Sequence, residues 1–209
     1  MYILDKGGIV INTVLLISSA VILTGTIATA AYLYYKDNGQ INNDNLDNKT
    51  VSNLRYFFSK SSSSPQKELI KVIKDACETI DVAVYYISER NIVTHLCSAT
   101  NRGVKVRIIT DKDDSYQETA LQQLLDAGIP VKINTYEGKM HLKNMIIDKE
   151  IITSGSYNFT YSAEKKNEEV VIISKDKKVA KEWSVKFNEM WNDTINYIPY
   201  KPKVNKKFA

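Results

Sequence analysis

An uncharged, largely apolar run from Gly7 to Tyr35 is the feature that most constrains this chain. The run is roughly thirty residues long, and a helix needs only about 20 apolar residues to cross a bilayer. It is too long for the apolar part of a cleaved secretory signal, and Asp5 beside Lys6 makes a weak basic flank for one. We therefore expect residues 1–35 to be an uncleaved membrane anchor, with one transmembrane helix within residues 9–35.

The remainder of the chain divides into a linker, a folded domain and a tail. Residues 36–52 are rich in Asn and Asp and lack apolar periodicity, which is typical of a linker. Residues 53–196 carry the apolar periodicity of a folded domain, and the positive charges from Lys36 onward favour its placement in the cytosol. Residues 197–209 contain no acid, and their four lysines equal the formal net charge of +4. We expect a basic tail there, either solvated or in contact with phosphates or a lipid surface.

Segments of strand and helix character alternate through residues 53–196. Strands are expected at residues 54–58, 80–86, 104–110, 131–134, 140–147, 151–153 and 170–173. Helices are expected to begin near Ser64 and Ser88, to end at Gly128, and to close the domain over residues 176–191. This alternation predicts an α/β fold in which helices flank a sheet, preceded by the one transmembrane helix.

One segment of the domain carries groups suited to phosphate chemistry. Alternate residues of a strand share a face, so His141 and Lys143 point the same way. An imidazole can attack phosphorus or transfer a proton, and a fixed ammonium can hold a phosphoryl oxygen. Ser156 and Asn158 are also two positions apart and would point the same way, and their side chains can donate to phosphate oxygens. A lone Asp148 cannot cage a divalent metal, and two cysteines are too few for a four-thiolate zinc site. We expect no metal and no other cofactor.

A His-x-Lys pair alone occurs by chance on exposed strands, but the full spacing is specific. His-x-Lys, four residues, Asp, six residues and Gly-Ser-x-Asn resembles the motif of the phospholipase D superfamily, and the match is complete over residues 141–158. The Asn-Phe-Thr that starts at Asn158, and the Asn-Glu-Glu that starts at Asn167, are similar to the small single-motif branch. That branch contains bacterial endonucleases and the membrane-anchored Zucchini-type proteins, also called mitochondrial cardiolipin hydrolases. The resemblance extends over about residues 54–192.

The resemblance implies a role for each residue of the motif. His141 would attack phosphorus and form a phosphohistidine intermediate. Asp148 would be mainly a structural and interface partner, although it is counted with the catalytic set. Glu169 would orient the histidine, with Glu168 as a close rival for that position. Three donors would hold the phosphoryl oxygens of the substrate: Lys143, Ser156 and Asn158.

A single motif per chain has a consequence for assembly. In-line displacement needs a nucleophile on one side of phosphorus and an acid on the other, and one histidine cannot supply both at once. The resemblance therefore implies a two-fold homodimer in which the two His141 side chains meet at the interface. A solitary monomer should be inactive.

The expected function is that of a membrane-anchored, metal-independent phosphodiesterase, most simply an endonuclease on single-stranded RNA or DNA. Five lysines in or near the motif could follow a phosphate backbone: Lys139, Lys143, Lys149, Lys165 and Lys166. The membrane tether and the basic tail favour the alternative, hydrolysis of cardiolipin or other anionic phospholipids. A non-catalytic membrane adaptor is a third reading. The branch implies a mitochondrial outer membrane, with the domain facing the cytosol, and a bacterial envelope is the alternative.

Overall fold

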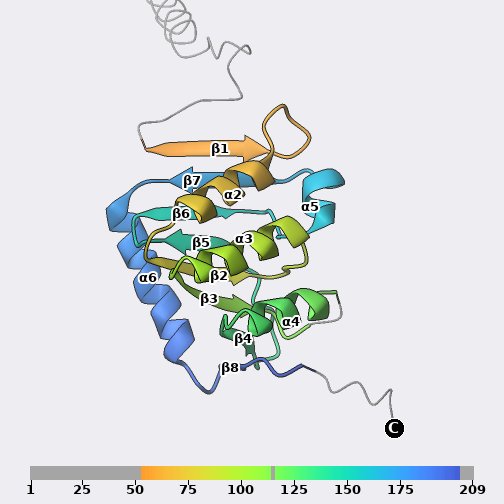
Figure 1. Cartoon of the computed structure of the whole chain (residues 1–209), viewed down its shortest axis with the longest axis vertical. Coiled ribbons are helices and arrows are strands. Elements are labelled where there is room, and N and C mark those ends of the chain that lie inside the picture. The colour runs from red at the N-terminus through yellow and green to blue at the C-terminus, as the bar shows by residue number, and fades with distance from the viewer. Residues whose placement is uncertain (1–52, 114–115, 203–209) are drawn as a thin grey trace, which may run out of the picture. The chain divides into compact units, whose positions relative to one another are not determined.

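A mixed sheet forms the centre of the computed structural model, which describes residues 53–113 and 116–202 (Figure 1). Its eight strands lie in the order β1-β7-β6-β5-β2-β3-β4-β8. Strands β2, β3 and β4 are parallel to one another, and every other neighbouring pair is antiparallel. The strands are β1 (Leu54–Phe58), β2 (Thr79–Val84), β3 (Lys105–Thr110), β4 (Val131–Asn134), β5 (Lys143–Ile147), β6 (Ile151–Gly155), β7 (Val170–Ser174) and β8 (Tyr197–Pro199).

Helices cover both faces of this sheet. Three of them, α2, α3 and α4, lie side by side over one face, and the long helix α6 packs against the other (Figure 1). Alternate residues of each central strand enter the two resulting cores: Val82 and Val84 of β2 face α2 and α3, whereas Ala83 faces α6. The helices are α2 (Pro65–Asp75), α3 (Arg90–Asn101), α4 (Glu118–Asp126), α5 (Tyr161–Lys165) and α6 (Lys177–Asn192).

Local sequence explains where several elements begin. The Ser64 hydroxyl accepts a hydrogen bond from the Lys67 backbone N–H at 3.2 Å, and Pro65 occupies the first turn of α2. Asp176 caps α6 in the same way, because its carboxylate accepts from the N–H groups of Lys178 and Val179. These caps satisfy donors that the helix itself leaves unpaired.

The α/β architecture with helices flanking the sheet is confirmed, and three details differ from the sequence prediction. The strand expected over residues 140–147 begins at Lys143. Helix α5 and strand β8 were not predicted, because each is too short to show periodicity. Strand β8 pairs with β4, so the sheet continues into residues 197–209, which the sequence assigned to the tail. The folded part therefore ends beyond residue 196.

The predicted anchor in residues 1–35 and the linker in residues 36–52 lie outside the described residues, and so do the last seven positions of the basic tail. Within the part of the chain that the structure describes, no helix is long and apolar enough to cross a membrane.

Candidate active site

Most of the motif residues gather at one end of the sheet, the end from which α5 projects (Figure 1). Lys143, the first residue of β5, is paired with Val84 at the end of β2. Gly155, the last residue of β6, is paired with Val171 near the start of β7. Because β5 and β6 are antiparallel, the segment before β5 and the segment after β6 lie at the same end of the sheet.

Gly155 is needed for the close approach of β6 and β7. Its φ is +148°, and a Cβ atom added to it would lie 2.0 Å from the Val170 carbonyl oxygen. The approach lets the Ser156 N–H donate to that oxygen at 3.1 Å, while the Val170 N–H donates to the Ser156 hydroxyl at 3.2 Å. The same hydroxyl donates to the carboxylate of Glu169. A glycine at this position thus brings the serine and the acid together.

The structure distinguishes between the two adjacent glutamates. The Glu169 N–H donates to the Ser59 hydroxyl at 2.8 Å, and the Glu169 carboxylate accepts from the Asn167 amide at 2.9 Å as well as from Ser156. Glu168 instead forms a 3.0 Å ion pair with Lys60, and its side chain is 79% exposed. Glu169 is therefore the glutamate that belongs to the site.

Lys143 is a buried cation beside this acid. Its side chain is 8% exposed, and its Nζ donates to the His141 carbonyl oxygen at 2.9 Å. The Nζ also lies 5.0 Å from the centre of the Tyr85 ring. Burial lowers the pKa of Lys143, and the negative charge of Glu169 opposes that shift. An ammonium held in this way can receive a phosphoryl oxygen without moving far.

His141 lies at the edge of the site with its ring 4.6 Å from the Tyr85 ring, centre to centre. Burial lowers the pKa of His141, and the positive charges of Lys143 and Lys139 lower it further, whereas Asp111 raises it. The net direction keeps the imidazole neutral at pH 7, with a nitrogen lone pair available. That protonation state is the one a nucleophile requires.

Asn158 follows β6 and precedes α5. Its amide oxygen Oδ1 is buried and has no hydrogen-bond partner among the described residues. An unpaired buried acceptor costs about 1–3 kcal/mol, and such atoms in folded proteins call for a specific reason. The unpaired oxygen of this last motif residue can accept from a donor on a ligand, whereas a phosphate oxygen would accept from the Nδ2 group of the same amide.

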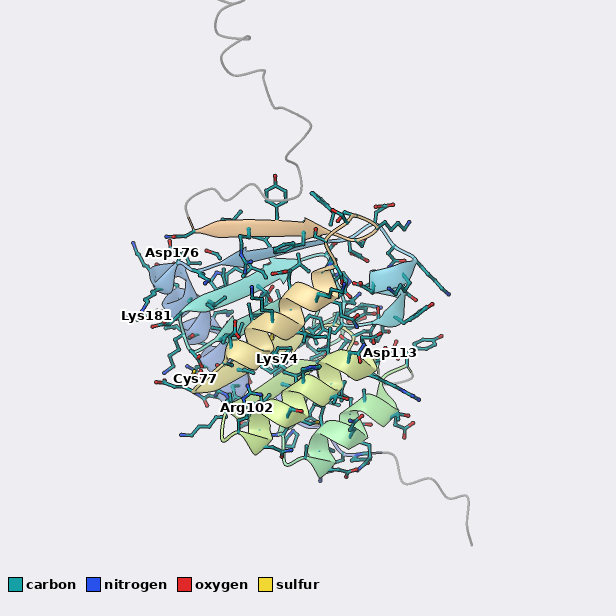
Figure 2. All side chains as sticks on the ribbon, turned by 45° about the horizontal axis from the view of Figure 1, so that its top comes forward. Lys74, Cys77, Arg102, Asp113, Asp176 and Lys181 are labelled. Carbon is teal, nitrogen blue, oxygen red and sulfur yellow. The ribbon has the colours of Figure 1, made fainter. Side chains whose placement is uncertain are left out.

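Asp148 does not lie with the other motif residues. It follows β5 at the opposite end, where its carboxylate accepts from the N–H groups of Cys77, Glu78 and Thr79 at 2.8–2.9 Å. Figure 2 shows Cys77 and Asp113 on opposite sides of the domain, and Asp113 follows β3 at the His141 end. The structure therefore places Asp148 in a structural role, holding the turn between α2 and β2.

Two residues near His141, Asp111 and Tyr85, were not identified from the sequence, and Lys139 was expected only as a contact of a phosphate backbone. The Asp111 carboxylate accepts from the Met140 N–H at 2.8 Å, which positions the segment just before His141. The Lys139 ammonium donates to the Tyr85 hydroxyl at 2.6 Å, and the Tyr85 ring contacts the imidazole. A signal for Asp111 was present, because it directly follows a buried strand of a parallel set, where sites commonly form.

Comparisons with known proteins agree with this geometry. Residues 69–191 match the family model described as cardiolipin synthase, PLD-like domain. A phospholipase D from Rickettsia prowazekii (strain Madrid E) is 38% identical over 147 residues, which cover 70% of this chain and 71% of that protein. A mitochondrial cardiolipin hydrolase from Xenopus tropicalis is 28% identical over 150 residues, covering 69% of this chain and 70% of that protein.

The fold has a solved counterpart. Nuc, a phospholipase D family member from Salmonella typhimurium, shares it with a TM-score of 0.64 at 24% identity, over 71% of this chain and 97% of that one. The chain thus belongs to the phospholipase D superfamily, which confirms the resemblance seen in the motif. It is an enzyme of that superfamily, a hydrolase.

Proposed function

We propose that this enzyme is a metal-independent phosphodiesterase that works through a phosphohistidine intermediate. The observation that carries the proposal is the convergence of a neutral imidazole, a buried ammonium and a serine–glutamate pair at one end of the sheet. In this assignment His141 is the nucleophile, and Glu169 holds the hydroxyl of Ser156 in position. Lys143, Ser156 and Asn158 bind the non-bridging oxygens as negative charge develops on them. Ser156 has one hydroxyl proton, so its hydroxyl turns from the Glu169 carboxylate to the phosphate when substrate binds.

The proposed reaction has two displacement steps. A nitrogen of His141 attacks phosphorus, the N–P bond forms, and the P–O bond to the leaving alcohol breaks as that oxygen takes a proton. Water then attacks phosphorus, the N–P bond breaks, and the proton of the water passes to the group that acted as the acid. The products are a phosphomonoester and an alcohol.

The acid in this scheme is the His141 of a second copy of the chain, which carries a proton while the attacking His141 is neutral. The chain has two histidines, and the other one, His95, lies on α3 with its Nδ1 2.7 Å from the Asn91 carbonyl oxygen. His141 is exposed at the edge of the site, where a second His141 can approach it across a two-fold axis. We therefore propose a homodimer as the active species.

Phospholipid is the substrate class that we place first, which reverses the order given by the sequence. Of the lysines expected to follow a nucleic-acid backbone, Lys149 lies beside Asp148 at the far end, and Lys139 donates to the Tyr85 hydroxyl. Lys143 is assigned to the scissile phosphate, which both substrate classes share. The relatives named phospholipase D and mitochondrial cardiolipin hydrolase support the lipid assignment. Those names, together with the predicted helix in residues 9–35, support attachment to a mitochondrial or bacterial membrane.

Single-stranded nucleic acid remains the second candidate, because Lys165 and Lys166 are exposed at the end of α5, which follows the Asn158 segment. They could contact a phosphate backbone on that side of the site.

The experiment compares the full chain with two histidine variants in detergent micelles containing EDTA. The substrates are bis(4-nitrophenyl) phosphate, cardiolipin, and labelled single-stranded RNA and DNA. We expect hydrolysis without added metal, loss of it in His141→Ala, and retention of it in His95→Ala. Acid-labile phosphate on a histidine should be trapped in the parent and in His95→Ala, but not in His141→Ala. Full activity of His141→Ala, or a requirement for magnesium, would contradict the mechanism.

A further inference from the structure

A groove runs from His141 along α6. Its mouth is a cavity of about 620 Å³ that opens beside His141, and its inner part is a recess of about 260 Å³ between β5 and α6. The two parts adjoin, because Leu142, Lys186 and Met190 line both of them. We call the whole the α6 groove. The remaining apolar walls of the recess are Ala83, Ile146, Trp183 and Phe187.

The polar residues of the recess are already paired. Asp81 accepts two hydrogen bonds from the Arg107 guanidinium at 2.7 and 2.8 Å, and Asn144 accepts one from Ser154 at 3.1 Å. The Arg107 guanidinium also lies 4.9 Å from the centre of the Phe187 ring. With these groups satisfied by their neighbours, the space that is left is suited to an apolar occupant.

The residue that follows His141 connects this groove to the nucleophile. Leu142 lines the recess together with Asn144 and Ile146, which alternate along β5, while its neighbours His141 and Lys143 belong to the phosphate site. A phosphodiester held at the imidazole therefore lies one residue away from the start of the groove. Any chain attached to that phosphate has a direct route along Leu142.

We propose that the α6 groove binds a hydrocarbon chain of a phospholipid substrate whose phosphate is held at His141. This inference rests on the proposed function and specifies its substrate. The recess is larger than the ~150 Å³ apolar cavities that bind benzene, so it accommodates several methylene groups. The mouth carries two lysines and two acids, Lys139, Lys186, Glu189 and Asp193. Such a balanced surface tolerates an anionic head group but offers no track for a polyanion.

The test measures how the rate depends on acyl length. The full chain in detergent micelles is given phosphatidylglycerols with two acyl chains of four to eight carbons. Burial of each methylene should raise kcat/KM about fourfold until the recess is filled, when kcat/KM is referred to the concentration of lipid dissolved in water. The variant Ala83→Leu places extra atoms in the recess and should flatten this dependence. Partition of each lipid into the micelle is the same for both proteins, so the ratio of their rates reports the groove alone.

Matched measurements separate the possible outcomes. Val185→Leu changes an exposed residue of α6 outside the groove and should keep the length dependence of the parent. Hydrolysis of bis(4-nitrophenyl) phosphate, which has no acyl chain, tests the proposed function separately. If the parent does not hydrolyse this compound, the proposed phosphodiesterase function is refuted, whatever the lipid series shows. The inference is overturned if Ala83→Leu and its parent show the same length dependence. It is also overturned if Ala83→Leu lowers the rate of oligonucleotide cleavage as much as it lowers the rate of lipid hydrolysis. The same conclusion follows if Ala83→Leu shifts the protein from dimer to monomer.

A binding measurement covers the case in which Ala83→Leu folds poorly. Trp183 lines the recess, and the only other tryptophan of the chain, Trp191, can be replaced by Phe. In His141→Ala/Trp191→Phe, phosphatidylglycerol with brominated acyl chains should quench the remaining tryptophan by at least half. The same lipid brominated only in its head group should quench it little. Equal quenching by both lipids would place the chain outside the recess and refute the inference.

Discussion

Replacement of Gly155 by alanine tests the close strand contact on which the site depends. The added Cβ would lie 2.0 Å from the Val170 carbonyl oxygen, whereas such contacts are essentially never shorter than 3.0 Å. Strand β7 must therefore move away by roughly 1 Å. That movement separates the Ser156 N–H from the Val170 oxygen, now 3.1 Å apart, and the Val170 N–H from the serine hydroxyl, now 3.2 Å away.

The expected loss of stability can be assembled from these parts. The two hydrogen bonds, one between backbone groups and one from the Val170 N–H to the Ser156 hydroxyl, contribute about 1 kcal/mol each. The φ of +148° is one that residues with a Cβ rarely adopt, and it adds about 1–2 kcal/mol. Gly155→Ala should therefore lower the free energy of unfolding by about 3–4 kcal/mol. It should also lower kcat more than one hundredfold, because Ser156 and Glu169 no longer meet.

Gly103→Ala is the matched control. Gly103 has a φ of +91°, and a Cβ added to it would have no atom within 4 Å, so only the backbone cost of about 1–2 kcal/mol applies. Urea denaturation of a form that begins at Ser52 measures both variants against the parent. The loss of free energy of unfolding should be about 2 kcal/mol greater in Gly155→Ala than in Gly103→Ala. Equal destabilisation of the two variants would show that β6 and β7 do not approach as the structure has them.

Three further predictions concern the charged groups. Asp148→Asn should lower the free energy of unfolding by about 2 kcal/mol, because the amide group that replaces one oxygen cannot accept from a backbone N–H. The same variant should leave kcat/KM unchanged. A large loss of kcat/KM at full stability would contradict the structural role. Glu169→Gln should lower kcat/KM by tenfold or more while Glu168→Gln does not, and steady-state assays of both variants check this distinction. The lowered pKa of His141 places the acid limb of the kcat/KM profile below pH 6.5, since the imidazole stays neutral until that pKa is reached. Lys139→Gln removes one of the charges that lower this pKa, so the limb should move to higher pH, and an unchanged profile would refute the assignment.

Much of the fold could be predicted because local signals and burial agree. The strands at residues 54–58 and 131–134 and the start of α2 after Ser64 all lie where patterning placed them. Strand β8 escaped prediction because its three residues, Tyr197–Pro199, are ordered by pairing with β4 and not by a pattern of their own. The location of Asp148 also depends on tertiary structure, because its distance from His141 is set by the direction in which β5 runs.

The order of the residues was sufficient to identify the superfamily. A histidine and a lysine two positions apart are followed at set intervals by Ser156 and Asn158, and the reversal of the chain between β5 and β6 brings these segments to one end of the sheet. Tertiary structure alone decided that Glu169 and not Glu168 meets the serine, that Asp148 holds a distant turn, and that Leu142 faces a groove beside α6. The reason is physical: each of those outcomes depends on which neighbouring strand or helix lies against the side chain, and residues that are remote in the sequence supply those neighbours.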